Sequence, residues 1–540
     1  MLFDRVKPLD AILATAEKKG LHRSLGAFQL TMLGIGAVIG TGIFVLTSEA
    51  AQKAGPGMLI SFIIAGFVCG VAALCYSELA SMVPVSGSAY TYTYAVNGEL
   101  LAWMVGWALI LEYAVGASAV AVGWSNFVVG RLGAAGVHIP AALSNADALM
   151  AHMYVAFGTP MSADLQKAME VGGWINIPAI VIVGFVTWLL VIGTTESARV
   201  NAILVAVKIA ALTAFIILTL PVLNATHFGG GALPTEKFMP TGMTGVLGAA
   251  ASIFFAYVGF DAVSTAAEET RNPQRNVPIG LIGSLGICTI FYLLVATGAI
   301  GAIGAQPVTD AAGTVLSPGS PELAGRCASI VASGAIEPLV CSKEALVHVL
   351  QVVNYPLVGW LVGLAAVIAL PSVVLMMMFG QTRVFFTMAR DGLLPEKLAS
   401  VHPKFKTPHV VTIVTGVAAA FAAAVLPVGK LADYSNSGTL FAFFMVAVSV
   451  MVLRVRDPNR TRPFKTPAVW IIAPLSMIGC IGLYFSLPLT AILVLPGWGA
   501  IGLLIYFLYS RSRSHVGKGI IDVPEPEAYG EIPPAVPGTE

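Results

Sequence analysis

Residues 32–44 read MLGIGAVIGTGIF, an apolar segment that carries glycine at positions 34, 36, 40 and 42. Each glycine weakens a helix by up to about 1 kcal/mol relative to alanine, so a helix opens easily here. Opened backbone leaves amide and carbonyl groups without partners, which lipid tolerates only where they face a cavity or a ligand. The alternative is close helix packing through Gly36 and Gly40, a Gly-x-x-x-Gly pair. This segment alone does not separate a packing face from a binding site.

The whole chain has the composition of a membrane protein. Of its 540 residues, 57% are hydrophobic and 11% are charged, and the mean hydropathy is +0.85. Soluble domains carry about 25% charged residues, so this chain could not cover a surface exposed to water. Its apolar runs are continuous, whereas the strands of a transmembrane barrel alternate apolar and polar residues. The composition therefore indicates a bundle of membrane-spanning helices.

Apolar stretches long enough to cross a bilayer as helices recur along the chain, since about 20 residues suffice. We predict an all-α polytopic membrane protein with twelve transmembrane helices, at 28–47, 57–83, 100–129, 176–194, 201–222, 242–266, 278–302, 348–379, 410–427, 436–454, 469–487 and 490–510. The first 27 residues hold no apolar core followed by a cleavage site. We therefore expect no cleaved signal peptide and a mature start at Met1.

Basic residues predict the orientation of the bundle. With the N-terminus inside, the inner segments hold 21 of the 29 Lys and Arg residues, the outer loops hold 7, and Lys208 lies within a span. This bias predicts a cytoplasmic N-terminal segment, 1–27, and a cytoplasmic tail, 511–540. The proline- and glutamate-rich end of that tail is expected to be disordered. The net charge of +1 gives no indication of a nucleic-acid partner.

Two predicted outer loops are long, 130–175 and 303–347. The second holds Cys327 and Cys341, the two cysteines outside the predicted spans. On an oxidising face of the membrane this pair could form a disulfide, although proximity in sequence does not establish the geometry. No spacing of cysteines or histidines suggests a metal site.

A second interrupted segment lies five spans after the first. Residues 254–265 read FFAYVGFDAVST, with a central glycine beside polar and aromatic residues. Interrupted helices at matching positions of two halves are typical of an inverted repeat with a substrate site at the membrane midplane. The amino ends of half-helices favour an anionic group, and free carbonyls favour an ammonium group. A zwitterion suits both.

Four motifs resemble the amino acid-polyamine-organocation superfamily: GIGAVIGTGIF at 34–44, PVSGSAYTY at 84–92, GFD at 259–261 leading to EETRNP at 268–273, and GQTR at 380–383 followed by MARDGLLP at 388–395. The last resembles the cationic amino acid transporter branch and its bacterial relatives. The resemblance runs from about Leu25 to about Pro467. It implies a five-plus-five inverted repeat, at 28–222 and 242–455, with discontinuous helices 1 and 6 and two further helices at 469–510.

The resemblance also implies a substrate site made largely of backbone. The substrate carboxylate would meet the backbone near Thr41 and Gly42, and its ammonium would meet carbonyls of the two broken segments. The residues it places at the ammonium are Val38, Phe255, Ala256 and Val258. Ile43 and Phe260, which begin the re-formed helices, are weaker candidates.

Charged residues inside spans are functional candidates because burying them is costly. The family places a lysine at the motif position of Lys208, where sodium-coupled relatives hold a sodium ion. Proton loss and gain at this lysine could couple transport to the proton gradient. The alternative is a permanent cation that ties its helix to carbonyls of the first span and to a hydroxyl of the eighth, such as Ser372.

Glu112 is the other lone charge near mid-span. The resemblance puts it near the substrate cavity, where it would contact the substrate or make a structural hydrogen bond. The acidic residue that the family often holds four positions earlier is Ala108 here. Asp261 and Glu78 sit nearer the inner ends of their helices, where a gate or packing contact and a contact with the substrate are equally open.

Three tyrosines and two basic clusters lie on the predicted inner side. Tyr90, Tyr92 and Tyr94 are expected in an inner-surface loop, and the clusters are interpreted as topology signals or anionic-lipid sites. The clusters comprise Arg383, Arg390, Lys404 and Lys406, then Arg454, Arg456, Arg460 and Arg462.

The resemblance implies a secondary active transporter that imports amino acids by alternating access across a bacterial cytoplasmic membrane, coupled to proton symport. An exchanger and a non-transporting amino acid sensor are the alternatives. We expect no enzyme and no cofactor beyond the proton gradient, because no nucleophile–base pair or metal cluster is evident. The expected partners are an amino acid, protons and membrane lipids. A small membrane peptide or a second copy of the chain, and the choice between cationic and small neutral substrates, stay open.

Overall fold

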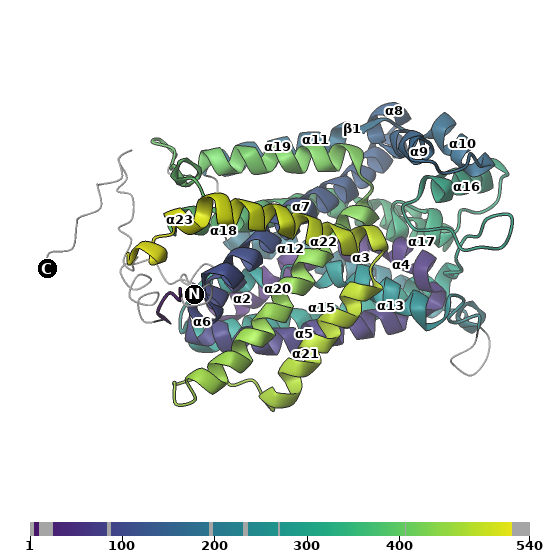
Figure 1. Cartoon of the computed structure of the whole chain (residues 1–540). Helices are drawn as coiled ribbons and strands as arrows, with labels where there is room; N and C mark the ends of the chain where they lie inside the picture. The colour runs from purple at the N-terminus through teal and green to yellow at the C-terminus, as the bar shows by residue number, and fades with distance from the viewer. Residues whose placement is uncertain are drawn as a thin grey trace, which may run out of the picture.

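Long helices running side by side make up most of the protein (Figure 1). The computed structural model describes residues 5–9, 25–83, 88–193, 198–229, 236–267, 270–405 and 407–520. Most of the predicted segment 1–27 and residues 521–540 of the predicted tail lie outside these ranges. The only strand in the described chain is β1 (Ile175–Asn176), which is two residues long.

Eight helical stretches are long and apolar enough to cross a membrane. They contain α5 (Met58–Met82), α7 (Glu99–Ala134), α12 (Ala198–Thr219), α15 (Pro273–Ile303), α18 (Pro356–Arg390), α20 (Val428–Arg456), α21 (Val469–Ser486) and α22 (Leu489–Ile505). Four shorter apolar helices accompany them: α2 (Ala27–Val38), α11 (Ile177–Ile192), α13 with its extension (Gly242–Tyr257) and α19 (His409–Val425). Each predicted segment overlaps one of these helices. The polytopic helical class is confirmed, and the number of helices that cross the membrane stays a prediction.

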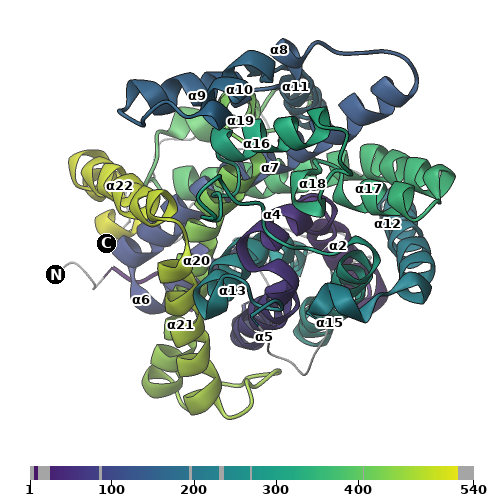
Figure 2. The same ribbon diagram turned by 90° about the vertical axis from the view of Figure 1, so that its right-hand side faces the viewer.

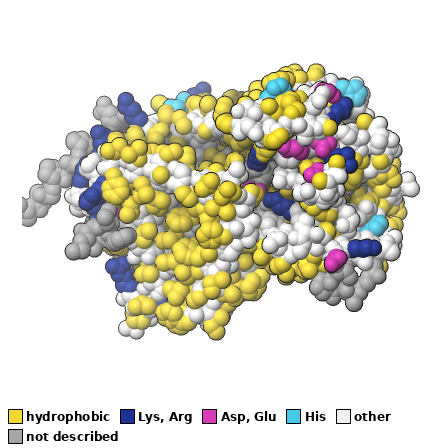
Figure 3. All heavy atoms as spheres, turned by 45° about the vertical axis from the view of Figure 1, so that its right-hand side comes forward, with side chains coloured by type: hydrophobic (Ala, Val, Ile, Leu, Met, Phe, Trp, Pro, Cys, Tyr) yellow, Lys and Arg dark blue, Asp and Glu magenta, His cyan; other side chains and the backbone are white. Residues whose placement is uncertain are grey.

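The outer surface of the bundle is apolar, as a lipid-facing surface must be. Large hydrophobic side chains point away from the protein along several helices, among them Phe185, Trp188, Phe421, Phe485 and Leu508. The face drawn in Figure 3 shows a wide apolar band, with basic side chains gathered toward one end.

The two long predicted loops contain helices of their own. The first forms α8 (Ala141–Ser144), α9 (Asp147–Ala156) and α10 (Ala163–Val171), and the second forms α16 (Pro321–Ala332) and the 3-10 turn η6 (Leu339–Cys341). Helix α10 packs on α16 so closely that a side chain at Gly325 would overlap the carbonyl oxygen of Asp164. We call these five elements the cap; Figure 2 views the molecule from the cap end. A disulfide joins Cys327 to Cys341 within the cap, with their Cα atoms 5.5 Å apart, so the suggested pairing is present.

The predicted span 348–379 begins within a separate helix. The chain forms α17 (Ala345–Val352), turns at Asn354 with φ +65°, and begins α18 at Pro356. Apolar residues flank Asn354 on both sides, so composition hides the turn, whereas a positive φ followed by proline ends one helix and starts another. Helix α18 then continues to Arg390.

The end opposite the cap carries the described parts of both termini. Arg5 donates to the carbonyl oxygen of Arg511 (2.8 Å) and pairs with buried Glu99 (3.2 Å). Lys7 pairs with Asp391 at 2.9 Å. We call this the terminal end.

The three tyrosines predicted for an inner loop lie instead on a helix at the terminal end, α6 (Ser88–Asn97), and are buried. Tyr90 donates to Asp391 (2.8 Å), and Tyr94 donates to Glu99 (3.1 Å). The loop prediction failed because the hydroxyls of Tyr90 and Tyr94 find carboxylates that are remote in sequence or on the next helix, so the segment can be buried.

Candidate functional site

The first helix is broken within the glycine-rich segment. Helix α2 ends at Val38, Gly40 adopts φ −140° and ψ −146°, and the helix resumes as α3 (Thr41–Phe44) and α4 (Leu46–Ala54). The first amides of a helix have no acceptor within that helix, so the N–H groups of Thr41 and Gly42 lack helical partners. The Thr41 hydroxyl is also buried without a hydrogen-bond partner among the described residues.

The second interrupted segment is broken at its central glycine. Helix α13 (Gly242–Ile253) tightens into the 3-10 turn η4 (Phe254–Tyr257), Val258 is extended, and Gly259 has φ +111°. Glycine adopts this φ without the steric penalty that a side chain brings. A short helix, α14 (Ala262–Thr265), follows.

The two breaks face each other. A Cβ atom on Gly42 would lie 2.3 Å from the Cα of Ala256, and one on Gly259 would lie 3.0 Å from the carbonyl oxygen of Ala37. Backbone therefore touches backbone at both places, which only glycine permits. Gly36 instead packs against Asn201 of α12, so one segment contains both a packing face and a break.

Tyr292 of α15 joins the two breaks. Its hydroxyl oxygen lies 2.8 Å from the carbonyl oxygen of Val38 and 2.8 Å from that of Ala256. Two carbonyls predicted to receive an ammonium group therefore converge on one point inside the bundle. Tyr292 is not among the predicted site residues; its signal in the sequence is a hydroxyl in the middle of the apolar span 278–302.

Lys208 lies beside the first break. Its side chain is 1% exposed, and Nζ donates to the carbonyl oxygen of Gly36 at 2.8 Å. The predicted tie to the first span is therefore present. The Ser372 hydroxyl donates to Ala369 in its own helix (2.8 Å), so its role beside Lys208 stays a prediction.

Glu112 lies on the terminal side of the breaks. Gly123 of the same helix, α7, packs directly on Thr41, and Glu112 precedes it by 11 residues, roughly 16 Å along a helix. Its carboxylate is fully buried, with Asp261 and the Thr439 hydroxyl near it. Asp261 accepts a hydrogen bond from Tyr113 at 2.7 Å.

The remaining predicted site residues lie at or next to the breaks. Phe255, Val258, Ile43 and Phe260 are all buried there. The carbonyl oxygen of Phe255 accepts from the Val258 amide (3.2 Å). Phe260 packs on Phe443, with ring centroids 5.1 Å apart. Whether these groups contact a substrate stays a prediction.

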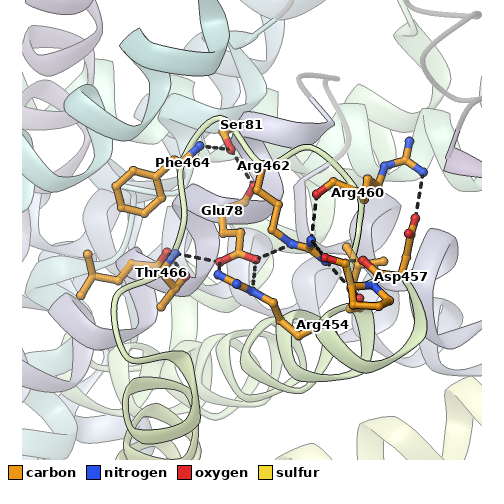
Figure 4. A network of polar contacts seen from close by, with 11 residues as sticks. Glu78, Ser81, Arg454, Asp457, Arg460, Arg462, Phe464 and Thr466 are labelled. Atoms are coloured by element: carbon orange, nitrogen blue, oxygen red, sulfur yellow. Dashed lines mark hydrogen bonds and ion pairs between the residues drawn. The ribbon is translucent and has the colours of Figure 1, made fainter.

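Glu78 forms an ion-pair centre at the terminal end (Figure 4). Arg454 donates to both carboxylate oxygens, at 2.8 Å each, and Arg462 pairs with one of them at 3.2 Å. The Thr466 amide donates to the same carboxylate at 2.8 Å. Glu78 thus holds α5 to α20 and to the segment after it, and two arginines of the second basic cluster serve as its partners.

A cavity of about 810 Å³ lies beneath the cap. Val45 and Val122 form part of its wall, and Val45 also lies beside Gly123, which packs on Thr41. The cavity therefore reaches the neighbourhood of the first break. Next to it, Lys53 of α4 bonds to Ser252 and pairs with Asp433 (3.2 Å), which ties α4 and α13 to α20. This network was not predicted, because residues 428–435 lie outside the predicted spans.

The fold and the site define a polytopic helical membrane protein in which two broken helices meet inside the bundle. The family described as amino acid permease matches residues 25–507. The chain belongs to this amino acid permease family, within the superfamily that its motifs resemble. It is a transporter and not an enzyme.

Several curated relatives cover most of the chain. The branched-chain amino acid permease BcaP of Bacillus subtilis is 42% identical over 94% of this chain and 97% of its own length. The methylthioribose transporter of the same organism is 39% identical over 95% of this chain and 99% of its own length. The vacuolar cationic amino acid transporter 2 of Arabidopsis thaliana is 35% identical over 84% of this chain and 63% of its own length.

Proposed function

We propose that this protein imports amino acids across a bacterial cytoplasmic membrane by alternating access. The observation that carries the proposal is the meeting of the Val38 and Ala256 carbonyl oxygens at the Tyr292 hydroxyl, beside the first amides of α3. Carbonyl oxygens suit an ammonium group, and unpaired amides at a helix start suit a carboxylate. An α-amino acid carries both groups on adjacent atoms. The names of BcaP and the plant transporter agree with this substrate class.

The binding roles follow from this arrangement. Thr41 and Gly42 would take the substrate carboxylate, and the carbonyl groups of the two breaks would take its ammonium. The residues that carry the carbonyl contacts are Val38, Phe255, Ala256 and Val258. Glu112 lies on the terminal side of the breaks. It would contact the side chain of the bound substrate, or the substrate after it has moved on toward the terminal end.

The architecture that fits this mechanism is twelve crossing helices in a five-plus-five inverted repeat. Helices α2 and α13 would hold corresponding places at the start of the repeats 28–222 and 242–455, and α21 and α22 would stand outside them. The disulfide in the cap supports an outer position for the cap end, because oxidising conditions favour disulfides. The termini would then be cytoplasmic.

Lys208 is the proposed proton carrier. A buried lysine at hydrogen-bond distance from Gly36 can bias the geometry of the first break through its charge. Loss of its proton would weaken that tie and release α2. Exchange without proton coupling, with Lys208 as a permanent tether, is the alternative mechanism; a non-transporting sensor is a more remote one.

Reconstitution into proteoliposomes tests the proposal. Labelled amino acid should accumulate against its gradient when the outside is acid, and the label should be recovered chemically unaltered. Accumulation that ignores pH and requires internal amino acid would instead establish an exchanger. No uptake of any amino acid in a broad panel would refute the proposed substrate class.

Methylthioribose is the second candidate substrate, because the relative of that name is 39% identical to this chain. A thio-sugar carries neither an ammonium group nor a carboxylate, so it would leave the polar groups of both breaks without their charged partners. Uptake of methylthioribose that is not inhibited by any amino acid would favour this candidate.

A further inference from the structure

The cap cavity is lined by four carboxylates, those of Glu49, Asp147, Glu337 and Glu344. Three of them have a basic neighbour. Asp147 pairs with Lys343 at 3.0 Å, and Glu344 pairs with Arg131 at 2.6 Å. Glu337 lies 3.7 Å from a ring nitrogen of His348. Figure 3 shows acidic side chains gathered beside the cap.

Glu49 differs from these three. No hydrogen bond or ion pair holds its carboxylate within the described part of the chain, although Lys53 follows one turn later on the same helix. The Lys53 ammonium is directed to Ser252 and Asp433 instead. With all three groups ionised, Glu49, Lys53 and Asp433 together carry one negative charge in excess, and Glu49 is the member of the group that lines the cavity.

The position of Glu49 is defined by close packing. Its carboxylate lies against Gly429 at the start of α20, where a Cβ atom would come within 2.7 Å of it. Glu49 follows Thr41 by eight residues, roughly two helical turns. Val45, between them, also lines the cavity. One wall therefore leads from Glu49 to the first break.

We infer that Glu49 is an ammonium-binding residue of an entry site in the cap cavity, which takes the amino group of a substrate before it reaches the two breaks. A charge-assisted bond between ammonium and carboxylate is stronger than a neutral one, and a partly enclosed cavity increases the attraction. The inference rests on the proposed function and adds to it a first contact outside the central site.

A binding measurement tests the entry site without transport. The probe is n-butylammonium chloride, which has an ammonium group and no carboxylate, compared with sodium chloride at equal ionic strength. Thermal stabilisation of the purified protein by the probe should need at least fivefold more probe in Glu49→Gln than in the unaltered protein. Asp147→Asn is the matched control, because Asp147 lines the same cavity but is paired with Lys343. This variant should need the same probe concentration for stabilisation as the unaltered protein.

Uptake kinetics give a second readout. Glu49→Gln should raise KM for the transported amino acid about fivefold or more and leave the maximal rate within twofold. Glu49→Asp keeps the charge, so its KM should lie between those of Glu49→Gln and the unaltered protein. This variant serves as the test if Glu49→Gln does not fold. Equal probe binding and equal KM in the altered and unaltered proteins would overturn the inference while transport stands. Glu49-dependent probe binding in a protein that transports no amino acid would support the ammonium site and refute the proposed function.

Discussion

The hydroxyl oxygen of Tyr292 lies 2.8 Å from the carbonyl oxygen of Val38, although 254 residues separate them in the sequence. The same hydroxyl reaches the carbonyl oxygen of Ala256, so a single side chain of α15 spans both broken helices. A tyrosine hydroxyl has one proton and can donate to only one of the two carbonyls at a time. Both carbonyls therefore keep acceptor capacity for an ammonium group.

Replacing Tyr292 with phenylalanine should weaken substrate binding and lower stability by about 1–2 kcal/mol, because two buried carbonyls lose their shared donor. KM for amino acid uptake should rise several-fold. Tyr484→Phe is the control, since Tyr484 donates to the Ile492 carbonyl (2.6 Å) between α21 and α22, away from the breaks. Equal KM values for the two variants would argue against a positioning role for Tyr292.

Lys208→Gln should abolish accumulation driven by a pH gradient, lowering it at least tenfold, and should preserve exchange of internal for external amino acid. The reason is that glutamine can still bond to Gly36 but cannot gain and lose a proton at neutral pH. The measurement is uptake into proteoliposomes with and without an imposed pH gradient, with Lys167→Gln on α10 as the control. Undiminished pH-driven accumulation by Lys208→Gln would remove the coupling role.

Glu344 should make the stability of the protein depend on pH. Burial raises the pKa of this carboxyl from 4.5 to about 7, against the opposing effect of Arg131. The folded state then binds more protons at Glu344 than the unfolded state between these values, so the contribution of Glu344 to stability is fully present below about pH 4.5 and is lost as pH rises through 7. The upper limit is on the order of 3 kcal/mol.

Thermal unfolding as a function of pH measures this effect. Glu344→Gln should flatten the decline between pH 5 and 7.5, roughly the interval in which the raised carboxyl titrates. Glu170→Gln, at an exposed position of α10, should leave the decline intact. A Glu344→Gln protein with the same pH profile as the unaltered one would contradict the prediction.

Thiol labelling should reveal the cap disulfide. Denatured, unreduced protein should take up alkylating reagent at four cysteines, Cys69, Cys75, Cys288 and Cys480, and at all six after reduction, as mass spectrometry would show. Replacing Cys327 and Cys341 with serine should destabilise the cap, since closing a loop of about 15 residues contributes about 3 kcal/mol. Six labelled cysteines without reduction would rule out the bond.

Glu78→Ala should be strongly destabilising, by about 3–5 kcal/mol, because it leaves the arginines around it without their shared carboxylate. Asp457→Ala is the comparison: Asp457 is 43% exposed and pairs with Arg460 at 3.6 Å, so its loss should change stability by less than about 1 kcal/mol. Chemical or thermal unfolding in detergent measures both. Similar small effects would show that the Glu78 centre contributes little.

Some features of this protein follow from local composition. Continuous apolar runs indicate membrane helices because lipid leaves the backbone no other partners, and each of the twelve predicted segments overlaps an apolar helix. The two interrupted segments open at the glycines Gly40 and Gly259 because the cost of breaking a helix is lowest there. The tie of Lys208 to the first span was likewise predictable, since a buried cation must find acceptors.

Other features depend on where distant segments meet. Tyr292, the partners of Glu78 and the Lys53–Asp433 pair join residues far apart in the sequence, and no local pattern names such partners. The boundary at Asn354 and the cap helices were not predicted for a related reason. A turn in the first case and amphipathic contacts in the second decide the structure there, and hydrophobic composition does not reveal them. Glycine positions in the sequence therefore indicated two weak points in helices. Packing through α15 turned them into one site, because only the folded chain brings the Val38 and Ala256 carbonyls to the same hydroxyl.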